Sequence, residues 1–299
     1  MTVKLGVMAP FVDGLITSGD FLREYAATLE ACGVESVYTV EHVVVADEYE
    51  LLYPYNAEGR MGGPRGGATM PDPLELLAFL AAASTTLRLG TAVVVAPLHN
   101  PAVLAKRAAT IDRISDGRLM LGLGIGWQKE EYAACGVPYE DRGARLEEGI
   151  VAMRALWADR PATHHGRYFD FEKVHSLPSP TNGAIPIVLG GHSEAAVRRA
   201  GRIGDGWFPF TISAEEFAEQ ADLIRQVAGE AGRDPGAVTL SAWPGSADPS
   251  RELELDWVRR FVDAGASRLV TRTVIDKPDQ LPEMREQLER YREAVIDRL

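Results

Sequence analysis

Short apolar runs alternate with longer amphipathic segments along the whole chain. The first apolar run is Val3–Ala9, and Asp20–Cys32 is the first segment with apolar residues at helical spacing. Runs made almost entirely of apolar and β-branched residues are typical of parallel strands that are buried on both faces. Later runs of this character cover residues 34–40, 87–95, 118–124, 185–189, 206–210, 238–243 and 268–272.

Helical segments separate these runs, so that the pattern predicts eight strand–helix units. The later helical segments cover residues 73–84, 101–115, 142–158, 193–203, 214–231, 253–264 and 278–299. Eight such units close naturally into a barrel of parallel strands ringed by helices. The alternative is an open doubly wound sheet, which normally carries a dinucleotide fingerprint after its first strand. Because Pro10–Gly14 does not supply one, we predict an α/β fold, a single (β/α)8 TIM barrel domain over residues 1–299.

Two segments are too long for the minimal repeat. Glu41–Asp72 follows the second predicted strand as a loop rich in Gly, Pro and Tyr, and loops of this length are usually functional or disordered. It leaves the carboxyl end of a strand, which is the end where barrel enzymes bind their substrates. Arg160–Asn182 is an insertion between the fourth and fifth strands, and its alternating stretch Gly166–Phe171 predicts a small hairpin.

Composition and charge narrow the function classes. With 46% hydrophobic and 25% charged residues the chain is not disordered, and its net charge of −12 disfavours a general nucleic-acid binder. Its two cysteines cannot build a disulfide framework. No apolar run is long enough to span a bilayer, and the N-terminus leads into a strand rather than a signal peptide. We therefore expect a cytoplasmic protein that binds neither nucleic acid nor membrane.

Glu41 and His42 stand together at the end of the second predicted strand. Polar side chains at this end of a barrel strand point into the mouth of the barrel, and histidine titrates near neutral pH. The two residues are therefore a candidate acid–base group. The alternative is a histidine on a surface loop without a chemical role.

Two glycine-rich turns end other strands. Gly122–Trp127 allows the backbone to approach a flat ligand closely, although a tight turn that needs positive φ explains the same glycines. Gly190–Ser193 joins a strand to a helix, where Ser193 can cap the helix and uncovered backbone N–H groups can bind an anion. No cluster of histidine, cysteine or carboxylate residues has metal-ligand spacing, so we expect no metal.

Further short motifs accompany these turns in a fixed order. They are Tyr53-Pro54-Tyr55, Gly59-Arg60-Met61, Pro71-Asp72-Pro73, Arg88-Leu89-Gly90-Thr91, Asn100-Pro101-Ala102, Gly117-Arg118-Leu119 and the segment from Ala200 to Trp207. Together with Glu41-His42 and the glycine-rich turns, they resemble the bacterial luciferase-like monooxygenase superfamily over nearly the whole chain. Within it, the chain looks most like the actinobacterial oxidoreductases that depend on the deazaflavin coenzyme F420.

The resemblance implies a role for each matching position. Glu41 and His42 would lie near the deazaflavin ring and the substrate, with His42 as general acid or base and Glu41 tuning or orienting it. A non-prolyl cis peptide bond between Ala92 and Val93 would lie behind the ring. Gly191-His192-Ser193 would form the phosphate-binding end. The remaining implied cofactor contacts are Gly124, Ile125, Gly126, Trp127, Glu130 and Gly190.

The function implied by the resemblance is hydride transfer between F420 and an unidentified small organic substrate, in a protein expected to be a homodimer. A deazaflavin lacks the nitrogen that lets a flavin activate oxygen, so oxygenation is not expected with this cofactor. The loop Val43–Met70 differs from that of sugar-phosphate-oxidising relatives, which disfavours a sugar phosphate. Two alternatives stay open: an FMN-dependent monooxygenase, and a cofactor-binding protein without turnover.

Overall fold

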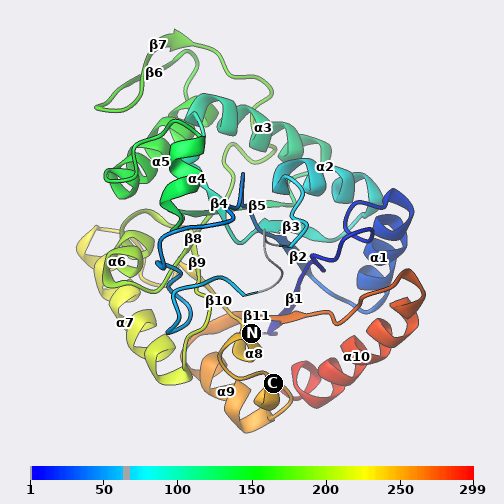
Figure 1. The fold of residues 1–299 in the computed structure, drawn as a ribbon. Helices are drawn as coiled ribbons and strands as arrows, with labels where there is room; N and C mark the ends of the chain where they lie inside the picture. Colours follow the sequence, from blue (N-terminus) through cyan, green and yellow to red (C-terminus); the bar gives the residue numbers. More distant parts are fainter. Residues whose placement is uncertain (1, 63–67) are drawn as a thin grey trace.

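Within residues 2–62 and 68–299, the part of the chain that the computed structural model describes, eight parallel strand positions form a closed barrel ringed by helices (Figure 1). Met1 of the predicted domain and residues 63–67 of the predicted long loop lie outside the described residues. The strands are β1 (Lys4–Met8), β2 (Ser36–Thr39), β3 (Arg88–Thr91) with β4 (Val94–Val95), β5 (Leu119–Gly124), β8 (Ile187–Gly190), β9 (Gly206–Phe208), β10 (Thr239–Ala242) and β11 (Ala266–Arg272). They neighbour one another in the order β3-β2-β1-β11-β10-β9-β8-β5-β4, and β3 also pairs with β5, which closes the barrel.

Helices cover the outside of the barrel and bury their apolar faces against it. The longer ones are α1 (Gly19–Ala31), α2 (Pro73–Ala83), α3 (Pro101–Ile114), α5 (Arg142–Ala158), α6 (Glu194–Ile203), α7 (Ala214–Glu230), α9 (Leu255–Asp263) and α10 (Leu281–Ala294). Shorter ones are α4 (Lys129–Ala134), α8 (Pro244–Ala247) and the 3₁₀ turns η1 (Ala96–Leu98), η2 (Pro249–Arg251), η3 (Pro278–Gln280) and η4 (Ile296–Arg298). Several begin at a side chain that accepts a backbone N–H of the first turn, the usual N-cap; these are Ser18, Asp72, Asn100, Ser193 and Ser213.

The predicted barrel is confirmed, with three differences in detail. The predicted third strand is divided, because Ala92 and Val93 leave the ladder between β3 and β4. The helices α4 and α8 were not predicted, since segments of six and four residues are too short to show a helical period. The insertion does form a hairpin outside the barrel, of β6 (Ala162–His165) and β7 (Asp170–Val174), but most of Gly166–Phe171 is its turn (Figure 1).

A partly buried ion pair connects the amino-terminal ends of two strands, with Arg268 buried and Glu35 partly exposed. Arg268 of β11 donates from Nε and Nη2 to the two carboxylate oxygens of Glu35, each at 2.9 Å. Since β1 pairs with β11 on one side and β2 on the other, the ion pair spans β1. Burial raises the pKa of Glu35, but the hydrogen bonds and charge of Arg268 outweigh that effect and hold the pKa below its ordinary value.

We predict that Arg268→Ala lowers the free energy of unfolding at neutral pH by about 2 kcal/mol, because it leaves a partly buried carboxylate without its charged hydrogen-bond donor. A carboxylate whose pKa is depressed in the folded state stabilises the fold above its unfolded pKa, and this contribution is lost as the pH falls. The difference between wild type and variant should therefore shrink below about pH 4. Urea denaturation at several pH values measures it. Arg23→Ala, which breaks an exposed pair with Asp20, is the control, and an equal loss in both variants would contradict the prediction.

Candidate active site

A cavity of about 920 Å³ opens at the carboxyl ends of the barrel strands. This is the end where barrel enzymes carry their active sites. The predicted site residues that line it are Glu41, His42, Ala92, Val93, Gly124, Ile125, Gly126, Trp127, Gly190, Gly191, His192 and Ser193. Glu130 is the exception: it lies outside the lining and accepts a hydrogen bond from the backbone N–H of Glu50 at 3.0 Å.

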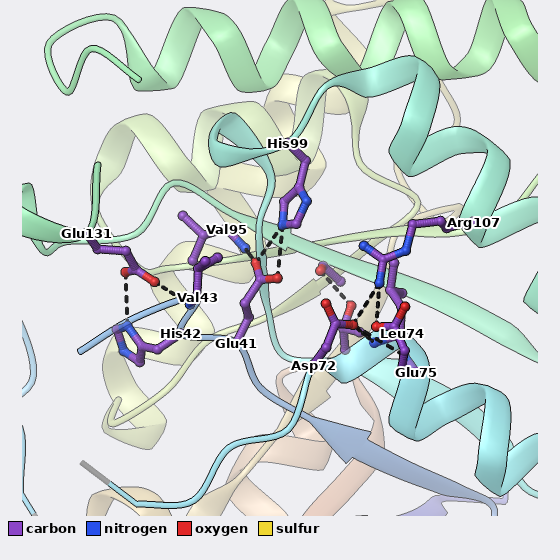
Figure 2. A network of polar contacts seen from close by, with 12 residues as sticks. Glu41, His42, Val43, Asp72, Leu74, Glu75, Val95, His99, Arg107 and Glu131 are labelled. Carbon is purple, nitrogen blue, oxygen red and sulfur yellow. Dashed lines mark hydrogen bonds and ion pairs between the residues drawn. The ribbon is translucent and has the colours of Figure 1, made fainter. Parts of the chain in front are cut away.

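Glu41 and His42 turn away from each other, as Figure 2 shows. The Nδ1 atom of His42 lies 3.0 Å from Glu131 Oε2. The carboxylate of Glu41 lies on the other side of the chain, against Val95 and His99. The structure does not support the expectation that Glu41 orients His42, because the Glu41 carboxylate is bonded to Val95 and His99 instead. The acid beside His42 is Glu131, which lies 89 positions further along the chain.

Glu41 instead forms hydrogen bonds at the end of the third strand position, which consists of β3 and β4. Its Oε2 atom accepts the Val95 N–H at 2.7 Å, and its Oε1 atom lies 2.9 Å from His99 Nε2. The Glu41 residue is only 7% exposed, so few water molecules can replace these bonds. His99 was not among the predicted site residues, because it follows a turn after the strand rather than the strand end itself.

The peptide bond between Ala92 and Val93 is cis, the geometry that the family resemblance implies. The side chain of Val93 packs over two glycines of neighbouring strands. A Cβ atom built on Gly124 would lie 2.5 Å from Val93 Cγ2, and one built on Gly190 would lie 2.8 Å from Val93 Cγ1. These two glycines therefore make room for Val93, a role that the sequence did not predict. Val93 and Ala92 form one wall of the cavity.

The turn between β8 and α6 has the features of an anion site. Gly191 has a φ of +89°, which a glycine adopts without strain. The Ser193 hydroxyl accepts the Ala196 N–H and caps the helix. An α-helix begins with four N–H groups that have no partner within the helix, so the first turn of α6 can offer others to an anion. The positive end of the helix dipole lies at the same place.

Three arginines that line the cavity were not identified from the sequence: Arg142, Arg199 and Arg272, the last residue of β11. Arg142, the first residue of α5, lies 3.8 Å from the ring centre of Tyr139, and its buried Nε atom has no hydrogen-bond partner among the described residues. Arg199 of α6 is buried and donates from Nε to Glu147 at 2.9 Å. Arg199 occupies a core-facing position of its helix, next to Ala200. A charged residue on the apolar face of a helix was the signal that could have pointed to it.

The long loop after β2 covers one side of the cavity with aromatic rings. Tyr53 lies edge-on to Trp127 and to Tyr55, with ring centroids 5.3 Å apart in both pairs. Tyr55 also contacts Phe210 at 4.9 Å and His192 at 5.7 Å, and in Figure 1 the segment after β2 crosses these strand ends. Burial, together with the neighbouring Tyr53, raises the pKa of Tyr55 to about 12, so its phenol stays neutral. The loop therefore forms an apolar wall.

Among the described residues, no group of three or more histidine, cysteine or carboxylate side chains could hold a metal ion. In the same part of the chain, no helix has the length and apolar character needed to cross a membrane.

We predict that Glu41→Ala lowers the free energy of unfolding by about 2 kcal/mol, because it leaves the buried Val95 N–H and the His99 ring without their acceptor. Glu41→Gln keeps one acceptor oxygen and should cost less. Urea denaturation measures both. Glu130→Ala removes an acid of similar size near the surface and serves as the control; if it costs as much as Glu41→Ala, the bonding role of Glu41 is wrong.

Three comparisons place this architecture among known proteins. Residues 3–298 match the family model described as luciferase-like monooxygenase. The uncharacterized protein Rv0940c of Mycobacterium tuberculosis is 30% identical over 256 residues, which cover 85% of each chain. An F420-dependent secondary alcohol dehydrogenase, solved with an F420–acetone adduct, superposes with a TM-score of 0.75 at 18% identity, over 99% of this chain and 98% of that one.

A second solved structure carries a different cofactor. It is the oxygenating constituent of 3,6-diketocamphane monooxygenase from Pseudomonas putida, in complex with FMN. Its TM-score is 0.75 at 17% identity, over 100% of this chain and 99% of that one. Sequence identities this low show a shared fold and do not indicate whether this chain binds F420 or FMN. The extent of the family match does decide the family: the chain belongs to the luciferase-like monooxygenase family.

Proposed function

We propose that the chain is an F420-dependent oxidoreductase that moves a hydride between the deazaflavin and an organic substrate. One observation carries the proposal: a single cavity joins an imidazole with a free ring nitrogen to an anion site flanked by arginines. His42 Nε2 has no hydrogen-bond partner among the described residues. The first turn of α6, Arg142 and Arg199 line the same cavity.

The residues present fit a cofactor with an anionic tail. F420 carries a phosphate and a chain of carboxylates, so its tail needs donors and positive charge. Gly191 and Ser193 would hold the phosphate at the start of α6, and the unpartnered Nε of Arg142 offers a further donor. The ring would lie against Ala92 and Val93. A chain with a net charge of −12 that gathers arginines in one cavity favours an anionic ligand there.

When bound, F420 supplies hydride transfer without activation of oxygen. His42 would hold or release the proton that accompanies the hydride, at Nε2, the nitrogen that Glu131 leaves free. Trp127 and Tyr53 would exclude water from this end of the cavity. The opposite arc mixes apolar and charged side chains: Met8, Phe11 and Trp243 lie at the ends of β1 and β10, and Arg272 and Asp276 follow from β11 between them. The substrate would therefore be a small organic molecule that combines an apolar part with a polar group.

Binding of the two cofactors tests the proposal. We expect F420 to quench protein fluorescence with a Kd at least tenfold below that of FMN, because its tail reaches more donors. Tight FMN binding without F420 binding would favour the FMN-dependent monooxygenase instead. If F420 binds tightly but a broad panel of substrates never oxidises its reduced form, the carrier without turnover is favoured.

We predict that Gly191→Asp weakens F420 binding more than tenfold, or about 1.4 kcal/mol, since it places a carboxylate where the phosphate would lie. At a φ of +89° any side chain is strained, so Gly191→Ala is needed to separate strain from charge. Fluorescence titration measures both, with circular dichroism as the check on folding. Equal affinities in the Asp and Ala variants would remove the phosphate from this turn.

We predict that His42→Ala slows single-turnover oxidation of reduced F420 by about 10²–10⁴, the range for loss of a general acid or base. Cofactor affinity should change little, because the anion site lies on other strands. Stopped-flow absorbance and fluorescence titration on the same variant measure rate and affinity. If binding weakens while the saturated rate stays at the wild-type value, His42 only packs against the ring.

A further inference from the structure

A polar run at the start of α4 binds the loop that follows β2. Each of its four side chains, Gln128–Glu131, contacts that loop. Gln128 Oε1 accepts the Ala46 N–H at 3.2 Å, and Glu130 Oε1 accepts the Glu50 N–H at 3.0 Å. Lys129 Nζ lies 2.6 Å from Glu50 Oε2. Three of the four residues thus attach the loop at positions away from His42.

Glu131 differs from its neighbours in what it binds. Its residue has no exposed surface, and both carboxylate oxygens are engaged. Oε1 accepts the Val43 N–H at 2.6 Å, while Oε2 lies 3.0 Å from His42 Nδ1, as Figure 2 shows. One buried acid therefore fixes both the backbone after His42 and one nitrogen of its ring.

We propose that Glu131 is the positioning residue for His42. A carboxylate accepts a hydrogen bond and cannot donate one when ionised, so the neutral imidazole beside it carries its proton on Nδ1. The lone pair is then on Nε2, the nitrogen that the described residues leave unbonded. An acid that holds a histidine in one tautomer and one orientation also stabilises the ring when it takes up a proton. The effect of Glu131 on hydride transfer rests on the proposed function, whereas the tautomer of His42 does not depend on it.

The surroundings of His42 leave Glu131 as its acid. Glu41 is adjacent in the chain, but its carboxylate is bonded to Val95 and His99. Trp127 lies edge-on to the His42 ring, at 5.8 Å between centroids, and carries no charge. Glu130, Glu50 and Lys129 interact among themselves at the outer side of the loop. Within the described residues, no second carboxylate bonds to the ring.

Nitrogen-15 NMR of the histidine rings tests the tautomer on the wild-type protein, without any cofactor. The chain has six histidines, and the signals that disappear in His42→Ala identify His42. At a pH where the ring is neutral, we expect the proton on Nδ1, the tautomer that free histidine disfavours. A proton on Nε2 in the wild type overturns the proposal, even if no variant folds.

Glu131→Gln and Glu130→Gln form a matched pair of variants. Glutamine at 131 can accept from Val43 with its oxygen and donate to His42 with its amide, so the ring proton should move to Nε2. We then expect single-turnover oxidation of reduced F420 to slow by about 10²–10⁴, because the wrong tautomer puts a proton on Nε2 in place of its lone pair. The Kd for F420 should stay within about twofold of wild type, since Glu131 does not line the cavity.

Glu130→Gln should change neither the tautomer nor the rate. A ring proton that stays on Nδ1 in Glu131→Gln, or an equal loss of rate in both variants, overturns the positioning role. If the wild type proves inactive with F420, the proposed function fails, while the NMR result still decides whether Glu131 fixes His42.

Discussion

The carboxylate of Glu41 accepts hydrogen bonds from the Val95 N–H and the His99 ring, and the end of the third strand position depends on this contact. Between β3 and β4 the chain leaves the ladder at Ala92 and Val93, and the Val93 side chain packs where Gly124 and Gly190 have no Cβ atom. A bulge of this kind needs an acceptor for the N–H that follows it, because a buried unpaired group is costly. Glu41 supplies that acceptor and so fixes one wall of the cavity.

His42 points the other way and depends on a different acid. Glu41 accepts the N–H of Val95 in β4, whereas His42 faces Glu131 on α4. The two adjacent residues after β2 thus bind different elements: Glu41 binds β4, and His42 contacts α4. The same segment continues into the loop whose Tyr53 and Tyr55 close one side of the cavity. The turn at the start of α6, which would hold the cofactor phosphate, contacts these rings where His192 lies edge-on to Tyr55.

The barrel could be predicted from the sequence because its signal is local and repeated. Most strand positions are short apolar runs, and several long helices, such as α6 and α9, gather their buried residues on one face. The glycine-rich turns and Ser193 were also visible, since turn and cap chemistry is read from a few neighbouring residues. The break at Ala92–Val93 came from the family resemblance alone, because the run itself is uniformly apolar.

The partners within the site could not be predicted in the same way. His42 and Glu131 are 89 positions apart, and Glu41 and His99 are 58 positions apart. Only the closed barrel brings such residues together, and nothing near Glu41 in the sequence excludes its pairing with His42. Glu130 was named from the family resemblance, and the sequence did not point to Glu131. Both residues bond to the loop after β2, and only the structure shows that Glu131 is the one beside His42.

The most direct measurement is a crystal structure of the protein with F420 bound. The account predicts that the deazaflavin ring contacts Ala92 and Val93, that the phosphate accepts hydrogen bonds from the first turn of α6, and that His42 Nε2 faces the ring across the cavity. A ring that binds away from the Ala92–Val93 wall, or a phosphate held without the α6 N–H groups, would contradict it.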